Sequence, residues 1–169
     1  DFATHLLNQL DLKKNSVISS THSNVDHYNP ISKTIVLSKK YYDSNSLTAI
    51  VIAAHEVGHA LQDAHGSKFL LLRTALVKLS TRLEKVASLL LISAPIITIA
   101  FKVPLLGAST LLLAIGVMTL PIIIHLITLP LEFDASFNKA MPILKTGYLK
   151  KEDIKSSKKI LTACALTYL

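Results

Sequence analysis

The sequence predicts a mainly α-helical fold with a small β element and a transmembrane helical hairpin. Three observations support this prediction. Two uncharged, apolar runs occupy residues 86–101 and 103–131 of the 169-residue chain. Apolar residues recur at three- and four-residue steps over residues 47–61, which is typical of an amphipathic helix. The β-branched segment at residues 34–38 is typical of a strand.

The N-terminal third is expected to contain one helix and two strands. A helix is predicted over residues 2–14, and a short strand around Val17 and Ile18. Residues 21–30 are expected to form a turn-rich loop before the strand at 34–38. We consider two roles for that last strand, a purely structural one and an open edge that hydrogen-bonds an extended substrate.

Residues 55–59 read His-Glu-Val-Gly-His. Residues four apart on a helix lie on one face, so His55 and His59 can bind one metal ion together. Glu56 is then close enough to reach a water molecule at that metal. Catalytic zinc sites use such nitrogen ligands and keep one position open for water. The alternative is an ordinary core helix whose histidines form local hydrogen bonds.

The surroundings of this pentad favour a well-formed helix. Residues 43–46 offer several candidate N-caps just before it. Gly58 lies in the middle of the helix, where glycine costs about 1 kcal/mol relative to alanine. We therefore expect Gly58 to allow close packing against another element, such as the one that carries the next metal ligand.

The two apolar runs predict a membrane hairpin, since a bilayer-spanning helix needs about 20 largely apolar residues. The second run is long enough by itself, and the first becomes so with the amphipathic stretch before it. Residues 102–104, Lys-Val-Pro, form the turn between them. A soluble hairpin is the alternative, but the rest of the chain is too short to cover so much apolar surface.

The net charge of +7 is unevenly distributed. Basic residues collect before the first run and after the second, whereas the turn between them carries only Lys102. Because positive residues collect on the cytoplasmic side, both ends of the chain and the metal site are expected to face the cytoplasm. Nucleic-acid binding is disfavoured, since no interleaved aromatic residues accompany the charge. Cys164 is the only cysteine, so an intrachain disulfide is excluded.

A catalytic zinc site needs a third protein ligand. His65 is rotated by about 80° from His55 on a straight helix. His125 lies within the second apolar run, where a neutral histidine bonded between helices is the preferred interpretation. Glu132 and Asp134 follow that run directly, so the hairpin can return either carboxylate to the metal helix. The spacing favours these two and leaves the choice between them open.

Other roles are also possible for Glu132, Asp134 and the nearby Ser136. Glu132 can also be a solvated carboxylate at a helix start, where the helix dipole favours it. Asp134 and Ser136 can orient a ligand histidine through a hydrogen bond. A helix is expected near residues 132–144, then a turn at 147–148 and a final helix over 152–166.

Several motifs together resemble the YugP-like neutral zinc metallopeptidases of bacterial membranes. Residues 26–30, Asp-His-Tyr-Asn-Pro, are similar to that family's Asp-His-Tyr-Asp-Pro, with Asn29 in place of the usual Asp. Residues 36–38 are similar to its following strand. Residues 53–62 resemble its metal helix, and residues 132–136 resemble its second signature. These segments cover most of the chain in matching order.

The resemblance implies a zincin-like, gluzincin-related peptidase core in the bacterial cytoplasmic membrane, with a polypeptide as substrate. It implies that His55, His59 and Glu132 bind Zn²⁺ and that Glu56 is the general base. His27 and Tyr28 are candidates for stabilising the oxyanion, although we slightly prefer the interpretation that residues 26–30 only shape a turn before the strand. The family's N-terminal transmembrane helix and hydrophobic C-terminal segment are not found here, so we expect a fragment.

The predicted function is therefore a multi-pass, membrane-bound zinc endopeptidase with its active site facing the cytoplasm. The alternatives are a non-catalytic zinc-binding membrane scaffold and a metal-dependent hydrolase that acts on other substrates. Residues 1–85 and 132–169 are expected to complete one peptidase domain around a transmembrane hairpin at 86–131. The sequence does not indicate an oligomeric state.

Overall fold

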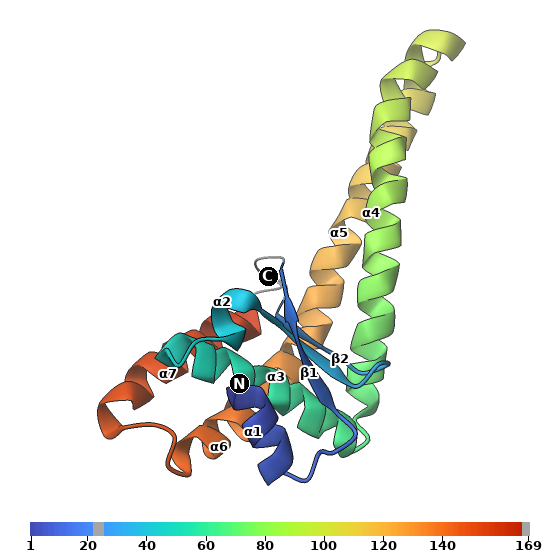
Figure 1. Ribbon diagram of the computed structural model, residues 1–169. Helices are drawn as coiled ribbons and strands as arrows, with labels where there is room; N and C mark the ends of the chain where they lie inside the picture. The colour runs from blue at the N-terminus through green and yellow to red at the C-terminus, as the bar shows by residue number, and fades with distance from the viewer. Residues whose placement is uncertain (22–25, 167–169) are drawn as a thin grey trace. The chain divides into compact units, whose positions relative to one another are not determined.

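The computed structural model describes residues 1–21 and 26–166. These residues form two compact units, each of which is described by itself. The first combines residues 1–71 with the chain from Leu129 onward, and the second comprises Leu72–Thr128. Helices dominate both units, and one three-stranded sheet lies in the first (Figure 1). The predicted mainly α-helical class with a small β element is confirmed.

The first helix, α1 (Phe2–Gln9), is shorter than predicted. Its N-terminus is capped by Asp1, whose side chain accepts a hydrogen bond from the Thr4 backbone N–H at 2.8 Å. The predicted end at residue 14 is wrong because Asp11 has a φ of 55°, a left-handed conformation that an α-helix does not contain. The apolar side of α1 contributes Leu6 and Leu7 to the core.

The sheet comprises β1 (Ser16–Ser20), β2 (His27–Asn29) and β3 (Thr34–Ser38). Its order is β1-β3-β2, with β1 parallel and β2 antiparallel to β3. The loop predicted over residues 21–30 therefore contains a strand, and its residues 22–25 lie outside the described part of the chain. The open-edge interpretation of residues 34–38 is wrong, because β3 pairs on both sides.

The core of the first unit lies between this sheet and the helices. Strand β3 contributes Ile35 and Leu37, each at most 1% exposed. The short helix α2 (Lys39–Tyr42) leads to α3 (Leu47–Ala64), the helix that carries the pentad. The N-cap of α3 is Ser46, whose side chain accepts from the Ala49 backbone N–H, as the sequence suggested.

Glycine at position 58 allows α3 to approach the chain that follows the hairpin. A Cβ atom added to Gly58 would lie 2.6 Å from the backbone oxygen of Ala135. Ala135 belongs to η1 (Asp134–Ala140), a π-helical segment that directly continues the preceding helix. The expected close packing of Gly58 is thus confirmed, and its partner is the segment just after Glu132.

Three further elements complete the first unit. They are α6 (Met141–Lys145), the short 3-10 helix η2 (Lys151–Asp153) and α7 (Ile154–Leu166). The helix expected near 132–144 is therefore a continuation of the hairpin's second helix through η1 and α6. Helix α7 buries Ser157, Leu161 and Ala165 and packs against α3 and η1.

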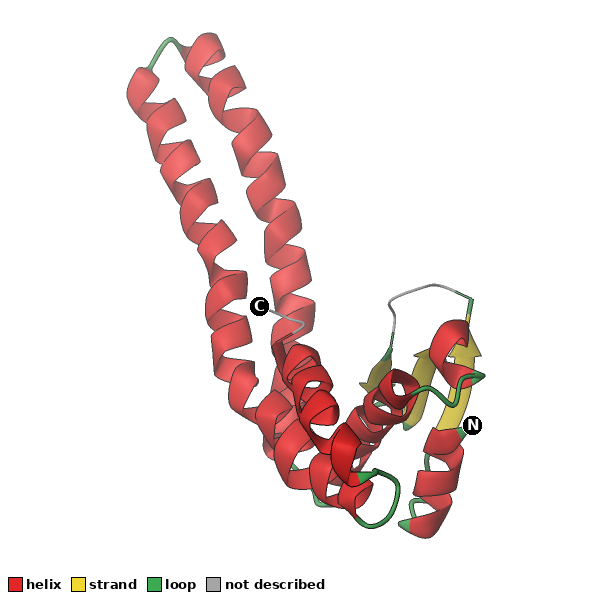
Figure 2. Ribbon diagram, turned by 90° about the vertical axis from the view of Figure 1, so that its left-hand side faces the viewer, coloured by secondary structure: helices red, strands yellow, loops and turns green. Residues whose placement is uncertain are grey.

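The second unit is an antiparallel helical hairpin (Figure 2). Its helices α4 (Lys68–Phe101) and α5 (Pro104–Phe133) each extend at their outer ends into the first unit. Both are long and apolar enough to cross a membrane, by length and composition, and only 11% of each apolar window is buried within the chain. The helices touch near the turn, where a Cβ on Gly107 would overlap Thr98 Oγ1.

We predict that Gly58→Ala destabilises the protein. Alanine favours the helix by about 1 kcal/mol, but overlap with a backbone carbonyl in a packed core costs about 1–3 kcal/mol. Gly116→Ala is the matched control, because Gly116 lies within α5 with no atom within 4 Å of an added Cβ. Denaturant unfolding in detergent should show a lower free energy of unfolding for Gly58→Ala alone. Equal values for both variants would contradict the packing argument.

Candidate metal centre

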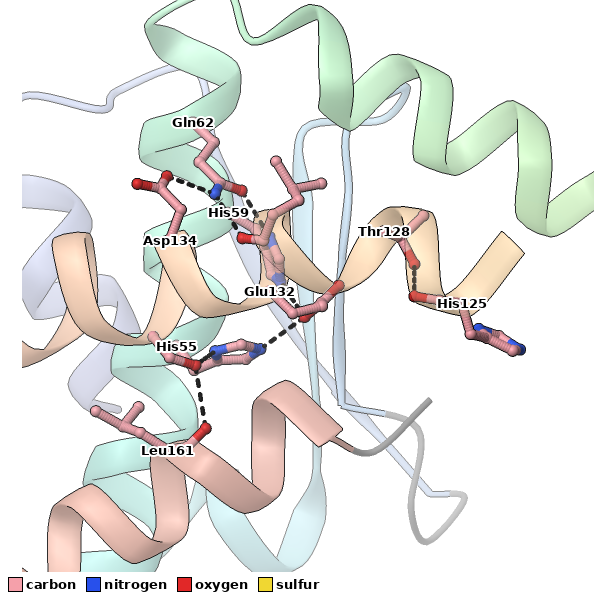
Figure 3. Close-up of polar contacts among 10 residues, drawn as sticks. His55, His59, Gln62, His125, Thr128, Glu132, Asp134 and Leu161 are labelled. Carbon is pink, nitrogen blue, oxygen red and sulfur yellow. Dashed lines mark hydrogen bonds and ion pairs between the residues drawn. The ribbon is translucent and has the colours of Figure 1, made fainter. Parts of the chain in front are cut away.

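The described residues contain one group of side chains suited to a metal ion, and it consists of His55, His59 and Glu132. The two histidines lie one turn apart on α3, and Glu132 lies in the last turn of α5. Their potential ligand atoms lie within 4.8 Å of one another, and all three side chains are buried. Figure 3 shows both imidazole rings directed toward the Glu132 carboxylate.

The spacing of these atoms fits a tetrahedral zinc site. The Glu132 Oε2 atom lies 3.4 Å from His55 Nε2 and 3.2 Å from His59 Nε2. Two ligands that each lie about 2.0–2.1 Å from a tetrahedral zinc ion are separated by about 3.3–3.4 Å. Two imidazole nitrogens and one carboxylate also match the donor sets of catalytic zinc sites. The residues present therefore fit zinc.

The other ring nitrogen of His55 is held by Ser136. Ser136 Oγ lies 3.0 Å from His55 Nδ1 and donates its own hydrogen to the backbone oxygen of Leu161 at 3.1 Å. Because a carbonyl only accepts, the hydroxyl oxygen must accept from an Nδ1–H on His55. This bond fixes the Nδ1–H tautomer of His55 and leaves the Nε2 lone pair directed at the Glu132 carboxylate.

His59 is held in the same way by Gln62, one turn further along α3. Gln62 donates its two amide hydrogens to the Leu131 backbone oxygen at 2.9 Å and to Asp134 Oδ2 at 2.8 Å. Its remaining polar atom, Oε1, lies 2.9 Å from His59 Nδ1 and must accept from it. His59 therefore also presents an Nε2 lone pair to Glu132.

These hydrogen bonds determine the electrostatics of the cluster. Two imidazole lone pairs and a carboxylate oxygen converge in a buried place, and all three are acceptors. Such an arrangement is repulsive unless a cation lies among them, since buried charge must be compensated. A divalent metal supplies that cation while both Nδ1 hydrogens stay in their present hydrogen bonds. The orientation of the side chains thus favours a metal.

Asp134 supports this arrangement as an anion. Burial favours its neutral form, but hydrogen bonds from Gln62 and Asn138 and the charge of Lys139 outweigh burial and lower the pKa of Asp134. Its ionised carboxylate accepts from Gln62, so it acts on His59 through the amide. The third-ligand alternative for Asp134 is not favoured, because its oxygens accept from Gln62 and Asn138.

Glu56 follows His55 on α3 and is 6% exposed. Helix α7, which carries the thiol of Cys164, packs against α3. Burial raises the pKa of Cys164 to about 12, and the nearby charges of Glu56, Asp26 and Glu132 add to this effect.

The two residues considered for oxyanion stabilisation lie on β2. The Tyr28 hydroxyl donates to Asp63 Oδ2, and that carboxylate also pairs with Lys33. Burial and the Asp63 carboxylate raise the pKa of Tyr28. Tyr28 thus joins the sheet to the C-terminal end of α3. Among the described residues, the group of side chains suited to a metal ion does not include His27, His65 or His125.

Comparison with known proteins agrees with this centre. A family model described as "Putative neutral zinc metallopeptidase" matches residues 1–169. The chain belongs to this family. The chain is 34% identical to the "Putative membrane protease YugP" of Bacillus subtilis (strain 168) over 145 residues, which are 85% of this chain. The chain spans only 60% of that relative's length. No solved structure matches.

Sequence reasoning assigned no role to Gln62, although the signal was present. Gln62 is a polar residue three positions after His59, where a side chain on the same helix face can reach it. It is 2% exposed, and a buried amide in an apolar helix requires partners. Those partners come from α5 and η1, which the sequence pattern alone does not place.

We predict that Gln62→Met weakens zinc binding about 10–100-fold, the usual effect of losing the partner of a ligand histidine. Methionine keeps the volume of glutamine but frees the His59 ring to rotate and to change tautomer. Competition with a chromophoric chelator measures the zinc affinity. Gln9→Met, an exposed change on α1, is the control and should keep it. Unchanged affinity in Gln62→Met would refute this role for Gln62.

Proposed function

We propose that this chain forms the catalytic part of a membrane-bound zinc endopeptidase. The observation that carries the proposal is the convergence of His55 Nε2, His59 Nε2 and Glu132 Oε2, and the buried carboxylate residue Glu56 follows His55 on the same helix. Membership of a zinc metallopeptidase family supports the same conclusion. The three converging side chains would hold Zn²⁺, which leaves a position for water and substrate.

In this proposal the metal and the protein have separate tasks. A bound zinc ion supplies Lewis acidity, which lowers the pKa of water to about 7 and polarises a carbonyl group. Glu56 accepts the proton of the attacking water and later donates it to the leaving amine. Ser136 and Gln62 keep both imidazole rings oriented throughout, so no ligand has to reorganise during the reaction.

His27 remains our candidate donor to the oxyanion that forms on the scissile carbonyl. It begins β2 directly after Asp26, whose carboxylate accepts a hydrogen bond from the Ser38 backbone N–H. Tyr28 is not assigned this role, because its hydroxyl is committed to Asp63. If His27 has this function, His27→Ala should lower kcat for casein and leave zinc affinity unchanged. An unchanged kcat would remove His27 from the mechanism.

We also propose that α4 and α5 cross the bacterial cytoplasmic membrane as a hairpin. Their length, composition and low burial support this, as does a relative named as a membrane protease. Basic residues at the two outer ends of the hairpin support a cytoplasmic position for the metal centre. A polypeptide substrate would then be cleaved on the cytoplasmic side.

We predict that Glu56→Gln keeps zinc and loses proteolysis. Loss of a general acid and base typically costs about 10²–10⁴-fold in rate, while His55, His59 and Glu132 stay in place. The assay is casein cleavage in detergent with zinc, with and without a chelator, alongside metal analysis of the same samples. Retained cleavage would exclude Glu56 as the base.

The unmodified protein in the same assay separates the alternative functions. A zinc-bound chain that cleaves neither casein nor small ester or amide substrates would be a scaffold. Cleavage of non-peptide substrates alone would indicate a hydrolase of another class. Either result would contradict the peptidase proposal but would leave the proposal of a zinc-binding centre intact.

The orientation of the hairpin gives a further prediction. In a Cys164→Ser background, Val103→Cys in the turn should react with a membrane-impermeant maleimide added to intact cells. Asn45→Cys, in the exposed loop before α3, should react only after lysis. Each label reports one side of the membrane, so the reverse pattern would contradict a cytoplasmic site. Labelling of both positions in intact cells would contradict it as well.

A further inference from the structure

The first half of α4 presents three cations on one helix face. Lys78, Arg82 and Lys85 follow each other at steps of four and three residues, so their side chains lie one above another. All three are exposed. Lys85 follows Lys78 by seven positions, which corresponds to about 10 Å along the helix axis. We refer to these three residues as the cationic stripe.

The charge of the stripe is not balanced by the part of the chain that the structure describes. None of its three residues forms an ion pair there. The nearest acidic residue in sequence, Glu84, accepts a hydrogen bond from Ser80, which is 3% exposed. Glu84 lies about 200° around the helix from Arg82, on the opposite face. Like charges at this spacing repel each other, so an external anion would relieve the stripe.

The position of the stripe along the hairpin is defined by the turn. Arg82 precedes Lys102 by 20 residues, which corresponds to about 30 Å of helix. This length equals the hydrocarbon thickness of a bilayer, about 30 Å. When the turn lies at one surface, the stripe therefore reaches the other surface, at the level of the phospholipid phosphates.

Apolar side chains of α5 lie at the same level as the stripe. Gly107 of α5 lies beside Thr98 of α4, and the two helices run antiparallel. Arg82 precedes Thr98 by as many residues as Ile123 follows Gly107, so these two residues lie at the same level. By the same count, Lys78 lies level with Ile127. Ile123 and Ile127 are 49% and 56% exposed. On α4 itself, Leu79 and Val86 beside the stripe are about half exposed. Cations and exposed apolar side chains thus occur together at one depth.

We propose that the cationic stripe binds the headgroups of anionic phospholipids in the cytoplasmic leaflet. An anionic phospholipid matches both features, since its phosphate pairs with Lys78, Arg82 and Lys85 and its acyl chain contacts the apolar side chains. Basic residues near a membrane surface each add about fivefold in affinity for anionic lipid. This inference rests on the membrane-crossing hairpin of the proposed function, but not on peptidase activity.

The test compares two triple variants of the full chain in neutral detergent. Lys78→Gln/Arg82→Gln/Lys85→Gln removes the stripe. Lys155→Gln/Lys158→Gln/Lys159→Gln removes the same charge from α7 and is the matched control. Phosphatidylglycerol is titrated against each protein, with phosphatidylcholine and inorganic phosphate as reference ligands. The rise in thermal unfolding temperature gives the apparent affinity, and circular dichroism confirms that each variant is folded.

The unmodified protein and the α7 variant should bind phosphatidylglycerol at least tenfold more tightly than phosphatidylcholine. The stripe variant should lose this preference, and Lys78→Arg/Lys85→Arg should keep it. Equal loss in both triple variants would show that only net charge matters and would overturn the proposal. Full competition by inorganic phosphate would likewise overturn it, because it would identify a simple anion site.

A separate measurement distinguishes failure of this inference from failure of the proposed function. The unmodified chain in membranes is washed with alkaline carbonate, which releases peripheral proteins. A chain that resists extraction but lacks a preference for phosphatidylglycerol would refute the stripe alone. A chain that is released would refute the hairpin, and the stripe proposal with it. Casein cleavage by the same preparation tests the peptidase proposal independently.

Discussion

The structure depends on three hydrogen-bond acceptors being held together in a buried place. Without a cation, the lone pairs of His55 and His59 would repel the Glu132 carboxylate beside them. Hydrogen bonds to Ser136 and Gln62 prevent both rings from turning away. The fold therefore holds these three side chains in an orientation that suits a metal ion, and this preorganisation is the physical basis for the proposed hydrolytic chemistry.

The rest of the first unit brings together candidate metal ligands that are far apart in the sequence. Glu132 and His59 are separated by 73 residues, and the intervening chain is largely the hairpin. Because Gly58 has no Cβ, α3 can approach the backbone of Ala135, just beyond Glu132. Helix α7 closes the arrangement by offering the Leu161 carbonyl to Ser136. The π-helical segment η1 lies at this junction, as such segments frequently do at functional sites.

The features that sequence could predict are those with a strong local pattern. The 3.6-residue period defines α3 and its pentad, and long uncharged runs define the hairpin. That a carboxylate just after the hairpin, Glu132 or Asp134, returns to α3 could be predicted because a hairpin returns the chain to its starting level. The choice of Glu132 came from the family resemblance and not from the spacing. Strand β2 was missed because its three residues have no pattern of their own and become a strand only by pairing with β3.

Other features depend on tertiary contacts that a single sequence does not reveal. The end of α1 is determined by the left-handed Asp11 rather than by loss of apolar period. Strand β3 lies in the centre of the sheet because it pairs with both β1 and β2, and the sequence of β3 does not show this pairing. Glutamine and tyrosine side chains can have several roles. For Gln62 and Tyr28, hydrogen-bond partners far along the chain determine which role each has. For Tyr28 that partner is Asp63, which makes it a link between sheet and helix.

X-ray absorption at the zinc edge tests the central claim most directly. Measured on the purified full chain after zinc loading, it reports the atoms around the metal and their distances. The account predicts one zinc ion with two imidazole nitrogens and carboxylate oxygen at about 2.0–2.2 Å, and loss of that carboxylate oxygen in Glu132→Gln. A spectrum that lacks the two imidazoles, or one that Glu132→Gln leaves unchanged, would contradict it.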